Sequence, residues 1–498
     1  MIDSKPIKSV AVIGAGAAGV ITAAALSREK YFDTIRVFER RDGAGGTWIY
    51  DADPTPPIEI APGKLPPDVD PPLSIPKTLP TSTPPNRQER FEKTPIYDSL
   101  TTNVPDIAMS FSDIPFPGGP FVPHEVPHHY LEDYVTAHKL APYFVFNTTV
   151  EDVSKLPSPA GRERWKLTLR RHAPDRAVDE WWSEEFDAVV IGNGHYSVPF
   201  IPEVKGLKKY TTLFPTRITH SKYYRTPHPY ANKRVLIIGN SASGHDITAE
   251  LVSHAALPVY QSRRTASRWD GPTPPPGMAW KPIISEFLPS GRIVFEDGSH
   301  LDDMDAVVYA TGYRASFPFW NARANGGPIW DYQNAKVVNG YWHTFLHTYP
   351  TIGLVGVPRV LTFRSWEYQA ITLARLFAGR LAKPLPPVAE QRRWERRRLE
   401  RTGHEGLKFH DVQWETGETH GWLRGLFEWA GLGTLEGEGR LPPALTKEVV
   451  WAIEHLRKYP EPGKGGRDEG DGEGEGEGAG EDGWVVVTGA KKDLLHFV

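Results

Sequence analysis

The stretch Gly14-Ala15-Gly16-Ala17-Ala18-Gly19 decides the fold of this chain. It follows the apolar run Lys8–Ile13, which predicts a buried parallel strand, and it leads into Gly16–Lys30, which predicts a helix. The three glycines permit a tight turn, a close approach of the backbone to a pyrophosphate, and close packing of helix on strand. The amide groups and the positive dipole at the helix N-terminus suit phosphate groups. The stretch therefore predicts a dinucleotide-binding unit.

A second strand of this unit is predicted over Ile35–Glu39, and it ends in an acidic residue. Glu39 lies 25 residues after Gly14, where a carboxylate suits an adenosine ribose with free hydroxyl groups. The next motif is Gly43-Ala44-Gly45-Gly46-Thr47-Trp48. Its small residues let the backbone approach a flat ring, and Trp48 can form a wall beside that ring. We interpret the motif as a flavin contact; the alternative is a glycine-rich turn with a core tryptophan.

A second glycine-rich loop, Gly239-Asn240-Ser241-Ala242-Ser243-Gly244, follows the predicted strand Arg234–Ile238 and also opens a helix. Serine replaces its middle glycine, which is tolerable if the hydroxyl bonds a phosphate. Arg263 and Arg264 follow the predicted strand Pro258–Ser262, at the position that is acidic in the first unit. Guanidinium groups there match a 2′-phosphate, whereas the alternative is solvent exposure. The first site is thus interpreted as an FAD site and the second as an NADPH site, with candidate contacts Gly239, Ser241, Ala242, Ser243, Arg263 and Arg264.

These units predict an α/β fold with two Rossmann-like dinucleotide-binding domains, a larger FAD domain and a smaller inserted NADPH domain. Further buried strands are expected at Phe186–Ile191 and Asp305–Ala310, and an amphipathic helix at Glu367–Arg380. Ala389–Arg401 is rich in arginine, which we interpret as a solvated helix face rather than a site for an anionic partner. The expected boundaries are residues 1–205 and 313–460 for the two parts of the FAD domain, 206–312 for the NADPH domain, and 461–498 for a tail.

Two segments have unusual composition. Residues 51–93 hold 12 prolines, which exclude a regular helix or a central strand. We expect a surface excursion and favour a decorative insertion over a lid or contact loop. Asp468–Asp482 alternates acidic residues with glycine and is expected to be disordered, whereas Trp484–Thr488 is a strand-like run that can pack back on the body.

The overall composition excludes several classes of function. The net charge of −4 gives no case for nucleic-acid binding. The absence of cysteine excludes disulfides, Cys-ligated zinc or iron–sulfur sites, and electron transfer to a cysteine pair. No apolar run approaches the ~18 residues that span a membrane, and Met1 to Pro6 have no signal-peptide architecture. A cytoplasmic enzyme is therefore expected.

Taken in chain order, the motifs resemble the flavin-containing monooxygenase family, of the fungal or yeast-like type, over roughly residues 8–380. Besides the two glycine loops, Glu39 and Gly45–Trp48, the pieces that carry the resemblance are Tyr97-Asp98-Ser99-Leu100-Thr101-Thr102-Asn103-Val104-Pro105, Gly194-His195 followed by Pro199-Phe200-Ile201-Pro202, Ala310-Thr311-Gly312-Tyr313 and Glu367-Tyr368-Gln369-Ala370. One hallmark motif departs from the family, because Phe214, His220 and Tyr224 match it but Thr216 stands at its glycine position. The tyrosine in place of tryptophan resembles this family more than Baeyer–Villiger enzymes.

The resemblance implies site residues as well. It implies that Asn103 lies beside the reactive edge of the flavin as the catalytic residue, where an amide can donate to a peroxyflavin oxygen. Taken alone, an asparagine before a proline-containing turn favours an Asx-turn cap. Together with the residues named above, the expected cofactor contacts are Gly14, Gly16, Ala17, Ala18, Gly19, Glu39, Arg40, Gly46, Thr47, Trp48, Asn103, Val150, Thr311, Gly312 and Gln369.

No metal site is expected. His220 has no second ligand at helical or hairpin spacing. His128 and His129 are adjacent, and adjacent residues on a helix or strand point apart, so the pair is interpreted as structural or as surface residues.

The expected function is an NADPH- and FAD-dependent monooxygenase that oxygenates a soft nucleophile, a sulfur or an amine nitrogen, through a flavin hydroperoxide. Its partners are a small-molecule nucleophilic substrate and O₂, and a homodimer is left open. Three alternatives remain: an NADPH oxidase that releases hydrogen peroxide, a Baeyer–Villiger enzyme acting on ketones, and a non-enzymatic NADPH-sensing module. The retained Asn103 and the Gly-Gly-Thr-Trp motif argue against the sensor, which needs only the second loop.

Overall fold

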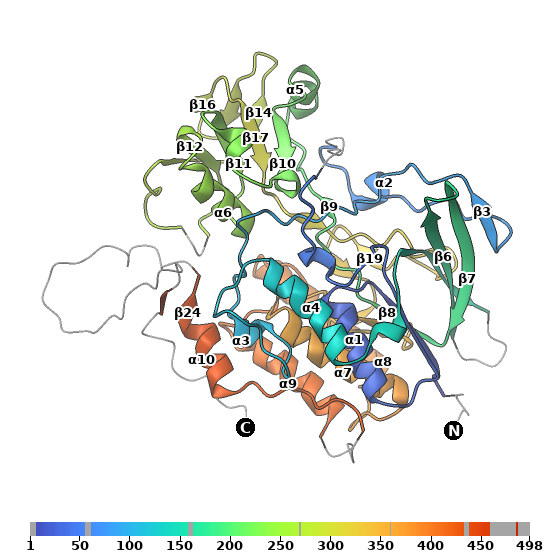
Figure 1. The fold of residues 1–498 in the computed structure, drawn as a ribbon. Coiled ribbons are helices and arrows are strands. Elements are labelled where there is room, and N and C mark those ends of the chain that lie inside the picture. The colour runs from blue at the N-terminus through green and yellow to red at the C-terminus, as the bar shows by residue number, and fades with distance from the viewer. Residues whose placement is uncertain are drawn as a thin grey trace, which may run out of the picture.

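A computed structural model of the chain describes residues 6–54, 61–157, 163–267, 270–358, 360–432, 438–458 and 485–486. The expected disorder of Asp468–Asp482 lies outside these residues, as do Met1–Lys5 and most of Trp484–Thr488. Figure 1 shows two bodies, a larger one that contains β1 and α10 and a smaller one, coloured green to olive, built from the middle of the chain. The α/β class predicted from the glycine loops is confirmed.

The larger body is centred on a seven-stranded sheet of order β21-β22-β23-β8-β1-β2-β4, in which β23, β8, β1, β2 and β4 run parallel. The strands are β1 (Ser9–Ile13), β2 (Thr34–Phe38), β4 (Phe144–Val145), β8 (Ala188–Ile191), β21 (Gly340–Tyr341), β22 (Phe345–Leu346) and β23 (Ile352–Leu354). β1 is apolar throughout its interior because both faces are covered. Val10 and Val12 pack with the helices, whereas Ala11 and Ile13 face a second sheet.

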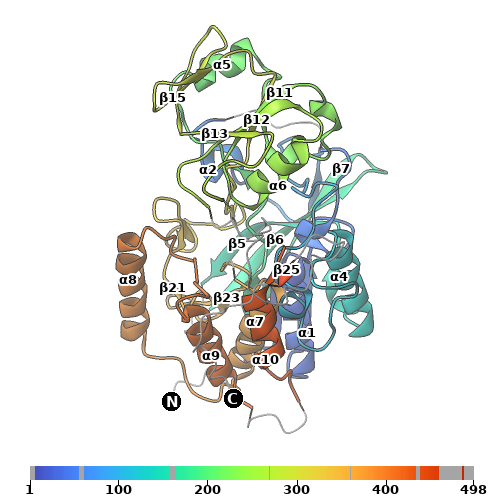
Figure 2. The same ribbon diagram turned by 90° about the vertical axis from the view of Figure 1, so that its left-hand side faces the viewer.

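That second sheet is antiparallel and has the order β3-β7-β6-β5. Its strands are β3 (Thr81–Thr83), β5 (Thr148–Leu156), β6 (Arg164–Ala173) and β7 (Val178–Phe186). The opposite face of the central sheet is covered by α1 (Ala17–Arg28) and α7 (Phe363–Ala378), which lie side by side in Figures 1 and 2. The other helices are α2 (Pro66–Val69), α3 (Asp106–Met109), α4 (Glu125–Ala137), α8 (Val388–His404), α9 (Glu418–Ala430) and α10 (Lys447–His455).

The smaller body repeats the strand–loop–helix plan. Its five-stranded parallel sheet has the order β10-β17-β11-β12-β13, with α6 on one face and a three-stranded antiparallel sheet and α5 on the other. The elements are α5 (Leu207–Leu213), β10 (Ile218–His220), β11 (Arg234–Ile238), α6 (Ala242–Leu251), β12 (Ala256–Ser262), β13 (Met278–Lys281), β14 (Ile284–Phe287), β15 (Ile293–Phe295), β16 (His300–Leu301) and β17 (Ala306–Tyr309).

Short antiparallel pairs complete the structure. They are β9 (Val198–Pro199) with β18 (Tyr313–Arg314), β19 (Trp330–Asp331) with β20 (Lys336–Val337), and β24 (Leu456–Arg457) with β25 (Val485–Val486). The last pair shows that the strand-like run near the C-terminus does return to the body. Within the part of the chain that the structure describes, no helix is both long and apolar enough to cross a bilayer.

Three expectations about local structure need correction. Phe186–Ile191 is not one strand: β7 ends at Phe186, and β8 begins after Asp187, whose carboxylate accepts from the amides of Lys8 and Ser9. The proline-rich segment does contain a helix, α2, although only a single turn that begins with prolines, where proline is tolerated. Its strand β3 lies at the edge of a sheet, which agrees with the exclusion of a central strand. On α8, Arg398 is buried and donates to Glu418 and to two backbone carbonyls, so only part of that arginine-rich face is solvated.

Candidate cofactor cavity and active site

Two glycines of the first loop, Gly14 and Gly19, have no room for a side chain. Gly14 has a φ of +98°, and a Cβ there would lie 2.7 Å from the carbonyl oxygen of Gly192. A Cβ on Gly19 would lie 1.8 Å from the carbonyl oxygen of Gly14. Gly16 faces the second glycine motif, where a Cβ on Gly46 would lie 2.7 Å from the Cα of Gly16. No side chain caps the N-terminus of α1, so its first amide groups are available to a phosphate.

Glu39 stands at the end of β2 and is buried. Its carboxylate accepts from the backbone amide of Ala15 at 2.7 Å and from that of Arg41 at 3.0 Å. The acid predicted to bind a ribose therefore also braces the turn of the glycine loop. Beside it, the Arg40 guanidinium donates to the carbonyl of Arg90 at 2.9 Å.

A cavity of about 420 Å³ opens in front of this loop, within the range of cofactor-sized sites. The predicted contacts that line it are Gly14, Gly16, Ala17, Ala18, Glu39, Arg40, Gly46, Thr47, Trp48, Asn103 and Val150. The structure thus brings together, around one space, residues that lie up to 136 positions apart in the sequence.

One wall of the cavity carries polar atoms without partners. Thr362 Oγ1 and Trp366 Nε1 are buried, line the cavity and have no hydrogen-bond partner among the described residues. The backbone is strained here, since Thr362 and Leu361 have φ values of +37° and +44°. Phe363 and Trp48 add aromatic surface, with ring centroids 6.3 Å apart. A hydroxyl and an indole N–H beside aromatic faces fit a flat ring edged with acceptors, so the cavity fits a flavin.

Asn103 lies at the rim of the same cavity and is exposed. Its neighbour Thr102 is anchored by two hydrogen bonds to Val122, at 2.8 and 3.1 Å. The Asn103 amide itself makes no hydrogen bond within the part of the chain that the structure describes, and the following helix α3 has no side-chain cap. The Asx-turn cap is therefore not formed, and the amide is presented to the cavity.

The proline-rich segment is not the decorative insertion we favoured, because Asp70 and Arg90 line the cavity. Arg90 is buried and pairs with Asp70 at 3.2 Å and with Glu151 at 3.1 Å. Burial raises the pKa of Asp70 to about 6, although Arg90 opposes the shift. No sequence pattern indicates that Arg90 pairs with Asp70 and Glu151, because the three residues lie far apart in the sequence.

Four predicted contacts do not line the cavity. Gly19 packs against the Gly14 carbonyl, behind the loop. Gln369 is fully buried on α7, where its Oε1 accepts from the amide of Gly356 and its Nε2 donates to Thr344 Oγ1. Because Gly356 lines the cavity, Gln369 positions the wall rather than forming it. Thr311 and Gly312 join β17 to β18 and bond to Phe200 and His220, and they do not line the cavity, so their role as cofactor contacts stays a prediction.

The second glycine loop also contains two glycines that have no room for a side chain. Gly239 has a φ of +112°, and a Cβ there would lie 2.6 Å from the carbonyl oxygen of Ala310. A Cβ on Gly244 would lie 2.2 Å from the carbonyl oxygen of Gly239. Ser241 is the N-terminal cap residue of α6, but its side chain makes no capping hydrogen bond. The Ser241 hydroxyl is exposed and can therefore meet a phosphate.

The two arginines after β12 differ in their surroundings. Arg263 pairs with Asp270 at 2.8 Å, and its guanidinium lies 3.4 Å from the ring centroid of Trp280. Asp270 also accepts from Asn240 Nδ2 at 2.7 Å, which ties this segment to the glycine loop. Arg264 is exposed. The sequence did not predict Asp270 and Trp280 as partners of Arg263, because only the folded chain brings them into contact.

The imperfect hallmark motif forms part of the link between the two bodies. Thr216 is exposed and has no left-handed backbone, so glycine is not required there. His220 is buried; its Nδ1 accepts from the amide of Lys222, and its Nε2 therefore donates to the Gly312 carbonyl at 3.1 Å. Burial lowers the pKa of His220 to about 3, so the imidazole is neutral and acts structurally.

Arg225 and Lys222 extend this link toward the cavity. The Arg225 guanidinium donates to the backbone carbonyls of Asp51, Thr94, Lys222 and Tyr224. Burial lowers the pKa of Lys222 to about 7, with repulsion from neighbouring guanidinium groups adding to the effect. The crossing segments are thus held by backbone carbonyls more than by carboxylates.

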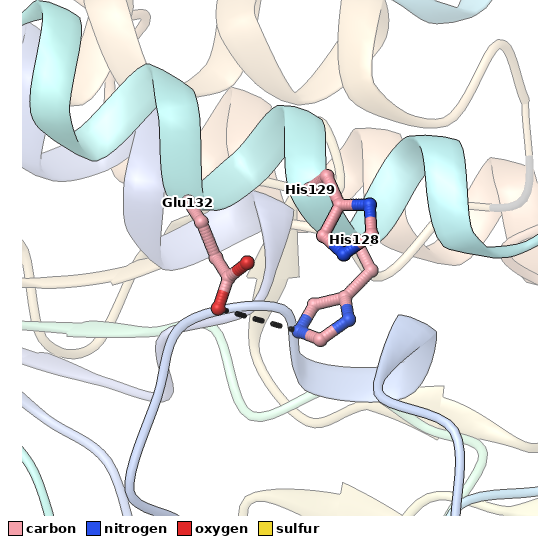
Figure 3. Close-up of side chains that lie close together, drawn as sticks. All are labelled: His128, His129 and Glu132. Carbon is pink, nitrogen blue, oxygen red and sulfur yellow. Dashed lines mark ion pairs between the residues drawn. The ribbon is translucent and has the colours of Figure 1, made fainter.

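His128 and His129 do not point apart as expected. Their rings lie nearly parallel, with centroids 5.5 Å apart, and His128 Nε2 is 3.7 Å from Glu132 Oε1 (Figure 3). Two free rotations per histidine side chain overcome the difference in direction of their Cα–Cβ bonds. The three side chains lie outside the cavity wall.

The whole chain was compared with known proteins. It matches the model of the flavin-binding monooxygenase-like family over residues 86–270 and 277–390, and that of an NAD(P)-binding Rossmann-like domain over residues 12–69. It is 29% identical to the flavin-containing monooxygenase iboF of Amanita muscaria, over 80% of this chain and 84% of that protein. It is 31% identical to the flavin-containing monooxygenase FMO GS-OX-like 9 of Arabidopsis thaliana, over 76% of this chain and 77% of that protein.

Among solved structures, the chain resembles the S-allyl-L-cysteine S-oxygenase from Allium sativum. The TM-score is 0.66 at 28% sequence identity, and the match covers 84% of this chain and 88% of that one. The structure of Tmm from a Pelagibacter strain matches with a TM-score of 0.64 at 21% identity, which is a likeness of fold.

Proposed function

Because the chain belongs to the flavin-binding monooxygenase-like family, we propose that it oxygenates a soft nucleophile, a sulfur or an amine nitrogen, on a small molecule. The chain is a flavin-dependent monooxygenase, with FAD and NADPH as its cofactors and O₂ and a small molecule as its substrates. When bound, FAD reduced by NADPH supplies the activated oxygen.

The observation that carries the proposal is the cavity between the first glycine loop and the strained segment before α7. The amides of α1 and the glycines at positions 14, 16 and 46 suit the pyrophosphate, and Glu39 suits the adenosine ribose. Thr362 and Trp366 offer donors to the edge of the flavin ring. Ser241 and Arg264 suit the phosphates of NADPH on the second loop.

We assign the reacting end of the cavity to Asn103. Its carboxamide is free of neighbouring side chains and can donate a proton in a hydrogen bond to the oxygen being transferred. Trp48, Phe363 and Trp366 line the same cavity and give it apolar walls, which would keep water from a reactive oxygen held inside it. The proposed chemistry needs no nucleophilic side chain, because the nucleophile is the substrate itself.

Sulfur is the nucleophile we test first. The structurally similar Allium protein is an S-oxygenase by name, and sulfur is the softer of the two atoms. The deciding experiment incubates the FAD-loaded protein with NADPH and O₂ in the presence of a thioether amino acid, a tertiary amine or a cyclic ketone. NADPH oxidation, hydrogen peroxide and product are measured together. We expect close to one sulfoxide or N-oxide per NADPH.

Two results would reject the proposal. Peroxide equal to the NADPH oxidised with every substrate would make the protein an NADPH oxidase, and lactone from the ketone alone would make it a Baeyer–Villiger enzyme. Asn103→Ala should keep NADPH oxidation while the product formed per NADPH falls at least tenfold, a loss of ~1.4 kcal/mol or more in transition-state stabilisation. The control is Asn334→Ala, which removes an exposed asparagine that does not line the cavity.

A further inference from the structure

Three side chains capable of binding a metal ion project from neighbouring turns of α4, outside the cofactor cavity. The ligand atoms of His128, His129 and Glu132 all lie within 4.8 Å of one another. Figure 3 shows the His128 ring directed at the Glu132 carboxylate, with the His129 ring beside it. His128 is half-buried, whereas His129 and Glu132 are exposed, so the group is open to an ion from solvent.

The spacing of these residues on the helix allows Glu132 to bind the same metal ion as either histidine. Glu132 follows His128 by four residues and His129 by three, and both spacings place side chains on the same helix surface. In a tetrahedral site with metal–nitrogen bonds of 2.0–2.1 Å, neighbouring ligand atoms are separated by ~3.3 Å. Rotations of exposed side chains close the remaining gap. Water can occupy the fourth position.

We propose that His128, His129 and Glu132 bind one divalent transition-metal ion of the Zn²⁺ type. Two imidazoles and one carboxylate suit Zn²⁺, Ni²⁺ or Cu²⁺, whereas Mg²⁺ and Ca²⁺ prefer oxygen ligands alone. The site is distinct from the proposed reaction, which uses none of these side chains.

The site also touches the flavin-side glycine motif. A Cβ on Gly45 would lie 2.6 Å from Cδ2 of His128 and 3.1 Å from its Nε2, so the imidazole packs directly on that backbone. Gly45 lines the cofactor cavity. An ion that fixes the His128 ring therefore restrains the cavity wall, and we infer that it slows the release of FAD.

The test measures Zn²⁺ binding to the FAD-loaded protein by calorimetry, with competition by a chromogenic chelator. His129→Ala and Glu132→Gln remove one ligand each without disturbing the packing of His128 on Gly45. The control is His300→Ala, because His300 is an exposed histidine 3.5 Å from the carboxylate of Asp302 that belongs to no such three-residue group among the described residues.

We expect the tightest Zn²⁺ site to weaken at least ~10-fold in both ligand variants and to be unchanged in His300→Ala. Mg²⁺ and Ca²⁺ should not compete. Equal Zn²⁺ affinity in all four proteins, or loss in the control as well, would overturn the proposal and identify the binding as non-specific.

A second measurement tests the link to the cavity. The rate of FAD release is followed by the rise of flavin fluorescence on dilution, with and without Zn²⁺. We expect Zn²⁺ to slow release at least twofold in the unmodified protein and to have no effect in His129→Ala. An unchanged rate in the unmodified protein, with Zn²⁺ bound, would reject the restraint on the wall while leaving the metal site in place. Neither readout depends on oxygenation, so failure of the proposed function cannot be mistaken for failure of this site.

Discussion

Tyr97 and Asp246 join the two nucleotide-binding bodies: the Tyr97 hydroxyl donates to Oδ2 of Asp246 across 2.5 Å. Tyr97 precedes the loop that carries Asn103, and Asp246 lies in the first turns of α6, just after the second glycine loop. Lys458 Nζ lies 3.3 Å from the same carboxylate and 3.3 Å from the carbonyl of Thr101. The Asp246 carboxylate thus links the segment before Asn103 to the helix that follows the second glycine loop.

Removing the Tyr97 hydroxyl should weaken this joint. Tyr97→Phe loses a hydrogen bond to a charged group, and we expect the free energy of unfolding to fall by about 1.5–3 kcal/mol, with FAD content unchanged. Denaturant unfolding measures the loss. Tyr230→Phe is the control, because the half-buried Tyr230 packs against Tyr224 and its hydroxyl makes no hydrogen bond to the residues that the structure describes. Equal stability of Tyr97→Phe and the unmodified protein would show that the bond contributes nothing net.

The glycine cradle predicts a variant that folds but loses FAD. A Cβ on Gly16 would meet nothing closer than the Cα of Gly46 at 3.5 Å, and the backbone there suits alanine. The methyl group would nevertheless occupy the approach to the pyrophosphate. Gly16→Ala should lower FAD affinity at least tenfold, about 1.4 kcal/mol, in a titration of the apoprotein. Gly43→Ala, where a Cβ meets nothing within 4 Å, should retain FAD. Full FAD content in Gly16→Ala would place the pyrophosphate elsewhere.

Arg264 should decide between NADPH and NADH. Arg263 is already engaged by Asp270 and Trp280, whereas Arg264 is exposed and can meet a 2′-phosphate. Arg264→Ala should raise the KM for NADPH about tenfold or more and leave that for NADH nearly unchanged, because only NADPH carries that phosphate. Steady-state kinetics with both nucleotides measure the ratio, and Arg292→Ala on the same body is the control. A parallel rise for both nucleotides would assign Arg264 to a shared part of the cofactor.

Asp70 gives the protein a pH-dependent stability. Burial raises its pKa from 3.8 to about 6 in the folded chain, so the folded state holds this proton more tightly than the unfolded state. The contribution is fully present below pH 3.8 and is lost as pH rises through 6. Asp70→Asn removes the cost of ionisation, so its stability relative to the unmodified protein should increase between pH 4 and 7, by roughly 3 kcal/mol at most. Denaturant unfolding across that range tests this, and the same substitution at the exposed Asp42 is measured alongside. A pH-independent difference would contradict it.

Much of the fold could be predicted because its decisive features are local. Gly14 and Gly239, where a Cβ would clash with the residue that follows a neighbouring strand, are recognisable from the apolar run before them and the helix after them. The strand Arg234–Ile238 has the bounds that its apolar pattern predicts. The two Rossmann-like units could therefore be predicted from local sequence patterns alone.

The remaining parts of the site depend on tertiary contact. The ion pair of Asp70 with Arg90 crosses a segment whose prolines indicate only that it is irregular. Thr362 and Trp366 become cavity residues because the chain turns sharply before α7, and nothing in their local sequence marks that turn. The likeness to a known family predicts that Gln369 touches the cofactor. In the structure Gln369 is fully buried and accepts a hydrogen bond from Gly356, which lines the cavity.

The pairing of β24 with β25 gives the C-terminal sequence a structural role. Leu456 lies opposite Val486 and Arg457 opposite Val485, so a strand from near the end of the chain closes on the segment that directly follows α10. A truncation before Val485 removes this partner strand and leaves the backbone groups of β24 without their ladder, so a shortened chain is expected to fray at the end of α10.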